Sequence, residues 1–292
     1  MKKNQTAGIV ACSNAVDKAY EYKIQELRDT LKSMGIDTVM SDHIYDTGYG
    51  YSGTGKERAE ALMKFYLDDN IDMIYDISGG DIANEILSYL DYEIISRTNK
   101  EFWGYSDLTA VINAIYVKTG KTSVLFQVRN LIGREWGMQC MRFEQMMQNE
   151  SKIFDRQNGS LFDVNYELVQ GEKMEGILVG GNIRCLLKLA GTEYWPDMSG
   201  KILFLEARSG QNSQMTNYLS HLKQLGVFDQ IHGLVLGTFS ELETCVGMPQ
   251  MKDLIAGYID EKLPFAMTRE VGHGADSKAI RIGENLIIEK NK

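Results

Sequence analysis

A serine that follows a glycine turn is the residue of this sequence best placed for covalent chemistry. The segment 103–109 reads Trp-Gly-Tyr-Ser-Asp-Leu-Thr, and apolar residues recur after it at helical spacing. This pattern predicts a short strand that turns at Gly104 into a helix beginning just after Ser106. At a helix N-terminus, backbone N–H groups and the helix dipole can stabilise an oxyanion. Ser106 is therefore a candidate nucleophile, although N-capping is the commoner role of such a serine and the usual Gly-x-Ser-x-Gly elbow lacks its last glycine here.

A second glycine turn could supply a donor to the same oxyanion. Ser78-Gly79-Gly80-Asp81 follows a predicted strand and precedes a helical pattern. Glycine lets the backbone approach a ligand closely, so the N–H of Gly80 is a candidate oxyanion donor. A plain strand-to-helix turn capped by Asp81 explains the pattern equally well. A phosphate-binding loop at residues 53–56 is excluded because Glu57 follows the lysine.

A serine nucleophile needs a base, and the base needs an orienting acid. The chain has four histidines, which are His43, His221, His232 and His273. His221 lies within an amphipathic helical pattern and His232 adjoins a predicted strand, whereas His43 in a Tyr/Gly-rich loop stays a candidate. His273 is favoured because its polar glycine-rich loop offers few structural reasons for an imidazole.

Glu206 is the candidate orienting acid. It follows the apolar strand 202–205, and the carboxyl ends of strands are where α/β sheets build their sites. A solvated strand end is the open alternative.

Alternating strands and helices are expected to position these residues. Predicted strands at 8–12, 37–40, 73–77 and 102–105 alternate with predicted helices at 24–34, 56–67, 82–90 and 108–118. This alternation is typical of an α/β protein with a parallel sheet flanked by helices. We expect a Rossmann-like (flavodoxin-like) N-terminal domain at 1–160 and a smaller α/β swivelling domain at 161–292.

The second half carries a similar pattern after a polar stretch. Residues 148–176 are predicted to form a linker or domain crossover. A strand ending at 180–182 and apolar strands at 202–205 and 234–236 follow. The last segment, 280–288, is predicted to be a hairpin that turns at Gly283 to Asn285.

Composition narrows the class of protein. The chain has 292 residues, 43% of them hydrophobic and 24% charged, and a formal net charge of −9. These values indicate a globular protein and argue against nucleic-acid binding, which needs a basic face. The start of the chain lacks the apolar stretch of a signal peptide, and no window predicts a transmembrane span. Four widely spaced cysteines without metal-ligand spacing predict reduced thiols, a cytoplasmic location and no metal or cofactor.

Several segments together resemble the S66 serine peptidases, the LD-carboxypeptidase family that includes microcin-immunity-type hydrolases. The matching segments, in order, are 78–81, 90–92, 104–110, 118–120, 180–182, 200–206, 226–229, 233–237 and 272–273. Each is weak alone, but their order and spacing cover nearly the whole chain. Departures at Cys12, Gln127 and Ala207 lie near the expected pocket and concern the substrate more than the reaction.

The resemblance implies a Ser-Glu-His triad of Ser106, Glu206 and His273. It also implies that the site forms between two domains and that the N–H groups of Gly80 and Asp107 make the oxyanion hole. Further implications are a homodimer, no cofactor and no metal. Arg129 and Arg134 could hold a substrate carboxylate, although surface ion pairs are the commoner role of such residues.

The implied reaction is hydrolysis of the amide bond between an L-configured centre and a terminal D-alanine in a cytoplasmic murein tetrapeptide. A microcin-immunity-like hydrolase of aminoacyl or peptidyl nucleotides is one alternative. A non-catalytic protein that binds peptides or muropeptides is another. In each case the expected partner is a small peptide-like molecule, and neither nucleic acid nor a membrane is expected.

Overall fold

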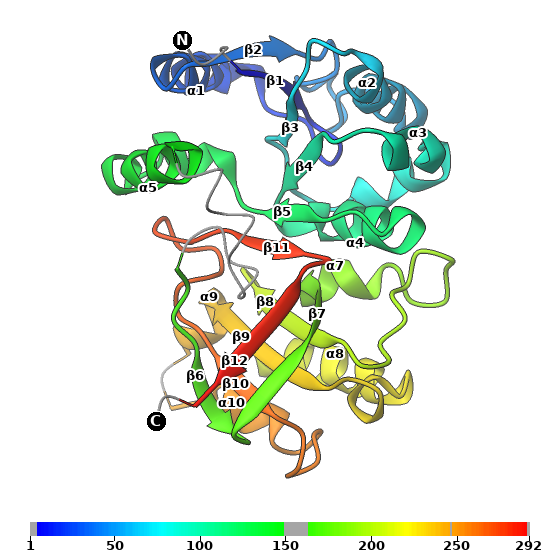
Figure 1. Ribbon diagram of the computed structural model, residues 1–292, viewed down its shortest axis with the longest axis vertical. Helices are drawn as coiled ribbons and strands as arrows, with labels where there is room; N and C mark the ends of the chain where they lie inside the picture. The colour runs from blue at the N-terminus through cyan, green and yellow to red at the C-terminus, as the bar shows by residue number, and fades with distance from the viewer. Residues whose placement is uncertain (1–4, 149–162, 246, 291–292) are drawn as a thin grey trace.

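Two six-stranded sheets organise the chain, one above the other in the computed structural model (Figure 1). The structure describes residues 5–148, 163–245 and 247–290. The first sheet contains β1 (Gln5–Val10), β2 (Ile36–Met40), β3 (Met73–Asp76), β4 (Glu101–Gly104), β5 (Ser123–Leu125) and β11 (Ile280–Ile282). Its order is β2-β1-β3-β4-β5-β11, with β1 to β5 parallel and β11 antiparallel at the edge. The order of the five parallel strands is the flavodoxin-like one.

Helices cover both faces of this first sheet. One face carries α1 (Glu21–Ser33) and α5 (Trp136–Gln148), and the other carries α2 (Gly55–Leu67), α3 (Tyr92–Arg97) and α4 (Thr109–Thr119) (Figure 1). In α1, Ile24, Leu27 and Leu31 recur at helical spacing and are buried against the sheet. A capping box between Thr54 and Glu57 begins α2.

The second sheet is mixed. Its strands are β6 (Glu167–Gln170), β7 (Lys173–Asn182), β8 (Ile202–Ala207), β9 (Gly233–Phe239), β10 (Phe265–Met267) and β12 (Asn285–Glu289). They lie in the order β12-β7-β8-β9-β10-β6, with β7 to β10 parallel and the two edge strands antiparallel. The helices of this half are α7 (Ile183–Leu187), α8 (Asn212–Gln224), α9 (Ser240–Glu243) and α10 (Met251–Ile255). Leu219 and Leu222 of α8 are among the residues buried in its core.

The predicted C-terminal hairpin is wrong. Ile280–Ile282 pairs with β5 of the first sheet, whereas Asn285–Glu289 pairs with β7 of the second. The turn at Gly283, which has a φ of +89°, therefore sends the chain from one sheet to the other. The hydrophobic periodicity identified both strands, but each pairs at the edge of a sheet with a strand that is distant in the sequence.

Two other segments also differ from their predictions. The stretch predicted as a linker, 148–176, contains β6 and the start of β7, and its residues 149–162 lie outside the described residues. The domain boundary predicted at 160 lies there too. The helix predicted at 82–90 is a 3₁₀ helix, η2 (Ala83–Tyr89).

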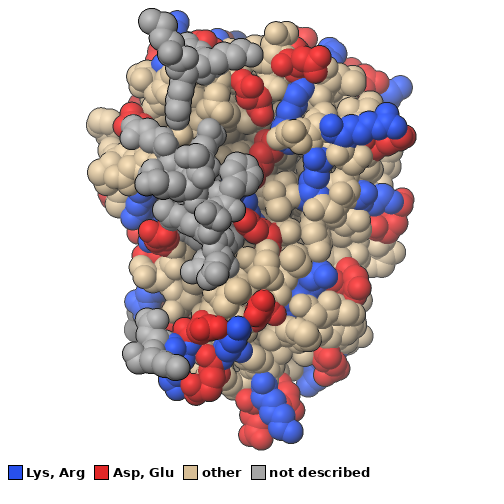
Figure 2. Space-filling model, in the orientation of Figure 1, with Lys and Arg blue, Asp and Glu red and all other residues tan. Residues whose placement is uncertain are grey.

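The charged surface is mixed in sign. Figure 2 shows Lys and Arg interspersed with Asp and Glu over the part of this face that is described. Ion pairs between the two kinds of side chain occur among the described residues, for example Lys118–Glu193 at 2.6 Å. Among the helices of the described ranges, none has both the length and the apolar character needed to cross a bilayer.

Candidate active site

Ser106 lies on a sharp turn between β4 and α4. It begins the short 3₁₀ helix η3 (Ser106–Leu108), and its φ of 56° is the only positive value at a non-glycine residue in the described ranges. L-residues adopt this conformation only at an energetic cost, so the surrounding structure must hold it. Gly104 permits the turn, because a Cβ there would lie 2.7 Å from Cβ of Leu108. The result is a hydroxyl presented at the start of the α4 segment.

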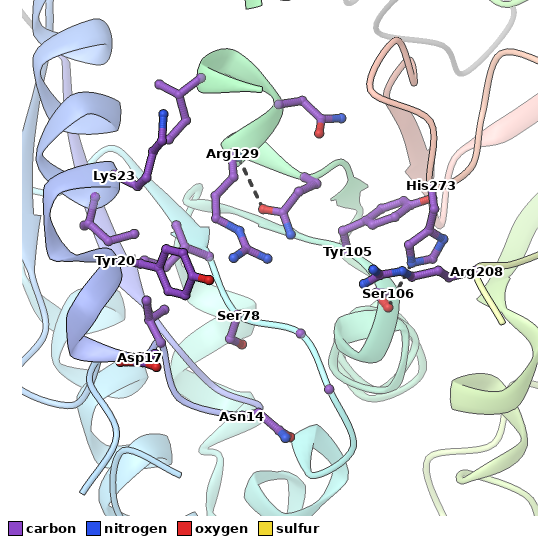
Figure 3. A pocket seen from close by; sticks show the side chains of 18 of the residues that line it. Asn14, Asp17, Tyr20, Lys23, Ser78, Tyr105, Ser106, Arg129, Arg208 and His273 are labelled. Atoms are coloured by element: carbon purple, nitrogen blue, oxygen red, sulfur yellow. Dashed lines mark hydrogen bonds between the residues drawn. The ribbon is translucent and has the colours of Figure 1, made fainter. Parts of the chain in front are cut away.

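Ser106, His273 and Glu206 are brought together from three distant segments. Figure 3 shows the first two of them, Ser106 and His273, side by side. The Oγ of Ser106 lies 3.1 Å from Nε2 of His273, and Nδ1 of His273 lies 2.6 Å from Oε2 of Glu206. A carboxylate can only accept, so Nδ1 carries the proton and Nε2 is free to accept one from the hydroxyl. This is the arrangement of nucleophile, base and orienting acid that acyl transfer uses.

Glu206 is fully buried in β8 and is held by two further donors. The hydroxyl of Tyr105 donates to Oε2 at 3.1 Å, and Nδ2 of Asn182 donates to Oε1 at 3.1 Å. Burial, and then the charge of Glu206, raise the pKa of Tyr105 well above its usual value, so its hydroxyl stays a neutral donor. The Tyr105 ring also packs against the imidazole of His273, with centroids 4.8 Å apart.

Sequence reasoning assigned neither Tyr105 nor Asn182 a role at the site. Both lie within segments that it had singled out: Tyr105 precedes the candidate nucleophile, and Asn182 ends a predicted strand. Pairing of Asn182 with Glu206 in the register of β7 and β8 is what brings these two side chains together.

Gly80, a predicted oxyanion donor, lies in a fixed turn beside the cavity. Its φ is +134°, and a Cβ there would come within 2.2 Å of the Asn14 side chain. The Asn14 side chain accepts from the N–H of Asp81 at 2.8 Å, and the carbonyl of Gly80 accepts from Arg184 at 3.0 Å. The backbone at Gly80 is thus held from both halves of the molecule.

Asp107, whose N–H is the other predicted donor, has a buried carboxylate. That carboxylate accepts from the Ser13 hydroxyl at 2.6 Å, from the N–H of Ala83 at 2.8 Å and from the ammonium of Lys188. Lys188 directly follows α7, so this ion pair joins the serine turn to the second half of the chain. The side chain of Asp107 therefore fixes the turn, while its backbone N–H stays a predicted oxyanion donor.

Ser106 and His273 open onto a cavity of about 770 Å³, whereas Glu206 is buried behind them. Ser106 and His273 line it, together with Gly80 and the arginines Arg129 and Arg208 (Figure 3). Arg134, the other arginine considered from the sequence, does not line it. Within the described ranges, no cluster of three or more potential ligand side chains forms a metal site.

The remaining histidines lie outside this cavity. Nδ1 of His43 lies 2.9 Å from the carbonyl oxygen of Ser52, within its own loop. His221 belongs to α8, and His232 precedes β9. Of the four, only His273 lines the cavity that contains Ser106.

Both halves of the chain match models of a known protein family. A family model for the LD-carboxypeptidase N-terminal domain matches residues 7–125, and a model for the LD-carboxypeptidase C-terminal domain matches residues 175–288. A "probable murein peptide carboxypeptidase" of Bacillus subtilis is 27% identical, over 97% of this chain and 88% of its own. The microcin C7 self-immunity protein MccF of Escherichia coli is 27% identical, over 83% of this chain and 78% of its own.

Solved structures share the fold along nearly the entire chain. An MccF-like protein from Bacillus anthracis has a TM-score of 0.83 and 25% identity, covering 100% of this chain and 95% of that one. A muramoyltetrapeptide carboxypeptidase from Oxalobacter formigenes has a TM-score of 0.80 and 22% identity, covering 98% and 96%. Because both domain models match in order and together cover most of the sequence, this chain belongs to the S66 family of LD-carboxypeptidases and is a hydrolase of the serine peptidase type.

Proposed function

We propose that this protein is a carboxypeptidase that removes a terminal D-alanine from a murein tetrapeptide by cleaving its bond to an L-configured centre. The observation that carries the proposal is the hydrogen-bonded relay from Ser106 through His273 to buried Glu206. The choice of substrate is supported by the similarity to a probable murein peptide carboxypeptidase and to a muramoyltetrapeptide carboxypeptidase.

In the proposed acylation step, Oγ of Ser106 attacks the carbonyl carbon of the scissile amide. Nε2 of His273, 3.1 Å from that oxygen, takes the hydroxyl proton, and Glu206 stabilises the imidazolium through Nδ1–H. The N–H groups of Gly80 and Asp107 are proposed to hold the tetrahedral oxyanion. His273 then gives its proton to the leaving amine, which departs as free D-alanine.

In the proposed deacylation step, water attacks the ester that joins the peptide to Ser106. His273 takes a proton from the water and returns one to Oγ of Ser106, and the shortened peptide leaves as a carboxylic acid. The resting enzyme is restored, and water is the only co-reactant that the cycle consumes. The tilted packing of Tyr105 against His273 supports one imidazole position for both steps.

The test is hydrolysis of a murein tetrapeptide by the purified protein, followed by mass spectrometry. We expect loss of one alanine with the wild type and a rate lower by roughly 10⁴-fold or more with Ser106→Ala. Full activity in that variant would overturn the proposal. A folded wild type that leaves the tetrapeptide intact would remove the murein peptide as substrate.

An aminoacyl nucleotide is the second candidate substrate. The observation that favours it is the likeness to MccF, whose structure in complex with glutamyl sulfamoyl guanosine has a TM-score of 0.86 to this chain at 22% identity. An aminoacyl sulfamoyl adenosine incubated in parallel separates the two candidates. Cleavage of this compound alone, lost in Ser106→Ala, would assign the protein to this second activity.

We further propose that the protein acts in the cytoplasm as a homodimer. All four cysteines are unpaired, which supports a reducing compartment.

Light scattering during size-exclusion chromatography tests the oligomeric state, for which a mass of twice 33.0 kDa is expected. A mass of 33.0 kDa at working concentration would contradict the dimer.

A further inference from the structure

Two arginine side chains, those of Arg129 and Arg208, face the cavity that contains Ser106. Arg129 belongs to the 3₁₀ helix η4 (Val128–Ile132), and Arg208 directly follows β8, two residues after Glu206. Both side chains are exposed, and neither guanidinium has a hydrogen bond or ion pair within the described residues. In contrast, Arg184 pairs with Asp81.

The two guanidinium groups affect each other electrostatically. Partial removal of the Arg129 guanidinium from water by the surrounding cavity lowers the pKa of Arg129. Two neighbouring charges have smaller effects: the buried carboxylate of Asp76 raises this pKa, and the guanidinium of Arg208 lowers it. Asp76 is itself occupied, because it accepts from the N–H groups of Cys12 and Ser78. Two like charges that face one cavity repel each other, and an anion between them would remove that cost.

The other charged side chains that line the cavity do not neutralise this pair. Lys23 is paired with Glu26 at 2.7 Å, outside the cavity. Asp17, the one carboxylate that lines the cavity among the described residues, accepts from the N–H of Ala19 at 2.8 Å. The cavity therefore keeps an excess of positive charge, although the whole chain has a net charge of −9.

We infer that Arg129 and Arg208 together bind the free carboxylate at the C-terminal end of the substrate, on the leaving side of the scissile bond. This inference rests on the proposed carboxypeptidase function and identifies what would restrict it to terminal residues. Guanidinium groups match carboxylates in shape and charge and pair with them in bidentate fashion.

The positions of the arginines agree with this role. The terminal carboxylate of such a substrate lies only two covalent bonds from the scissile nitrogen, so its binding groups must lie beside the nucleophile. Figure 3 shows Arg208 reaching toward Ser106 and His273, and Arg129 pointing into the same cavity from a different segment, η4. A peptide whose chain continues past this point would place an uncharged amide between the two cations.

The test measures binding to Ser106→Ala protein, which keeps the cavity but not the nucleophile. The two ligands are the murein tetrapeptide with a free terminal carboxylate and the same peptide with a terminal amide. By calorimetry we expect the acid to bind about 10- to 100-fold more tightly than the amide. Adding Arg129→Gln or Arg208→Gln should weaken binding of the acid by about tenfold or more, with little effect on the amide. The matched control is Arg134→Gln. Arg134 is exposed and lies five positions after Arg129 in the sequence, but it does not line the cavity.

Equal affinity for acid and amide would overturn the inference, as would arginine variants that weaken both ligands equally. A second ligand pair separates this failure from failure of the proposed substrate. If the tetrapeptide does not bind, N-acetyl-D-alanine and its amide are compared by ligand-observed NMR. Arginine-dependent binding of the acid alone supports the carboxylate site, and absence of discrimination refutes it.

Discussion

Replacing Glu206 by glutamine should leave the fold intact and yet remove most of the activity. The carboxylate accepts from His273 and Tyr105 at Oε2 and from Asn182 at Oε1. The side-chain amide of Asn182 cannot flip to exchange its oxygen and nitrogen, because its oxygen caps α7 by accepting from the N–H of Cys185. In Glu206→Gln the new amide oxygen must therefore face Asn182, and the new NH₂ must face His273.

The new NH₂ group changes the tautomer of His273. An NH₂ donor makes Nδ1 an acceptor, so the imidazole proton moves to Nε2, which faces the Ser106 hydroxyl and can no longer take its proton. If the new amide were turned the other way, its NH₂ group would face the NH₂ group of Asn182, and two donors would oppose each other without an acceptor. A wrong tautomer costs about 10⁴ in kcat in a serine protease, which corresponds to about 5 kcal/mol of barrier.

We expect Glu206→Gln to lower kcat/KM for the tetrapeptide by about 10³- to 10⁴-fold, with an unchanged circular dichroism spectrum. Tyr105→Phe is the control, because it removes one donor to Glu206 and leaves the other two. Its loss should stay within about tenfold, since one such hydrogen bond contributes about 1 kcal/mol. Glu206→Gln activity within tenfold of the wild type would refute the proposed role of the acid.

Three further predictions concern the surroundings of the serine. In Gly80→Ala the new Cβ would clash with Asn14 and displace the Gly80 N–H, so we expect kcat to fall by about 10²- to 10³-fold. Gly79→Ala, which has open space at its Cβ, should be nearly neutral, and equal losses in the two variants would contradict an oxyanion role for Gly80. Lys188→Met leaves the buried Asp107 carboxylate without its cation, so thermal unfolding should show a loss of stability of about 3 kcal/mol. Lys118→Met removes one member of a solvent-exposed ion pair and should be nearly neutral; equal losses in the two variants would contradict the role of Lys188. Cys12 and Cys185 are buried, whereas Cys140 and Cys245 are partly exposed, so a thiol reagent at pH 8 should label Cys140 and Cys245 first. Rapid labelling of Cys12 in the folded protein would contradict its burial.

The sequence pattern predicted correctly those parts of the structure that depend on residues close to one another in the sequence. The turn at Gly104 and the helix after Ser106 follow from a glycine and from apolar residues at helical spacing, and the structure has both. The α/β class followed from the alternation of strands and helices, and the structure confirms it. His273 could be favoured because its loop offered no packing role, and it does lie beside Ser106.

Features that depend on distant pairing could not be predicted in this way. The turn at Gly283 looks like a hairpin locally, but β11 and β12 complete two different sheets. Arg208 had no local signal, because only the meeting of β8 with the loops of the first sheet places it in the cavity. Tyr105 was part of an apolar run by type, and its hydroxyl acquires a partner only when Glu206 is brought to it from the second sheet.

Activation of Ser106 by His273 is the central step of the proposed mechanism. The decisive measurement is labelling with a fluorophosphonate, a reagent that reacts with activated serines, followed by intact-mass analysis and peptide mapping of the wild type and of His273→Ala. We expect a single adduct on Ser106 in the wild type, and labelling slower by roughly 10³-fold or more in the variant. An unlabelled wild type, an adduct on a different serine, or equal labelling of both proteins would contradict this mechanism.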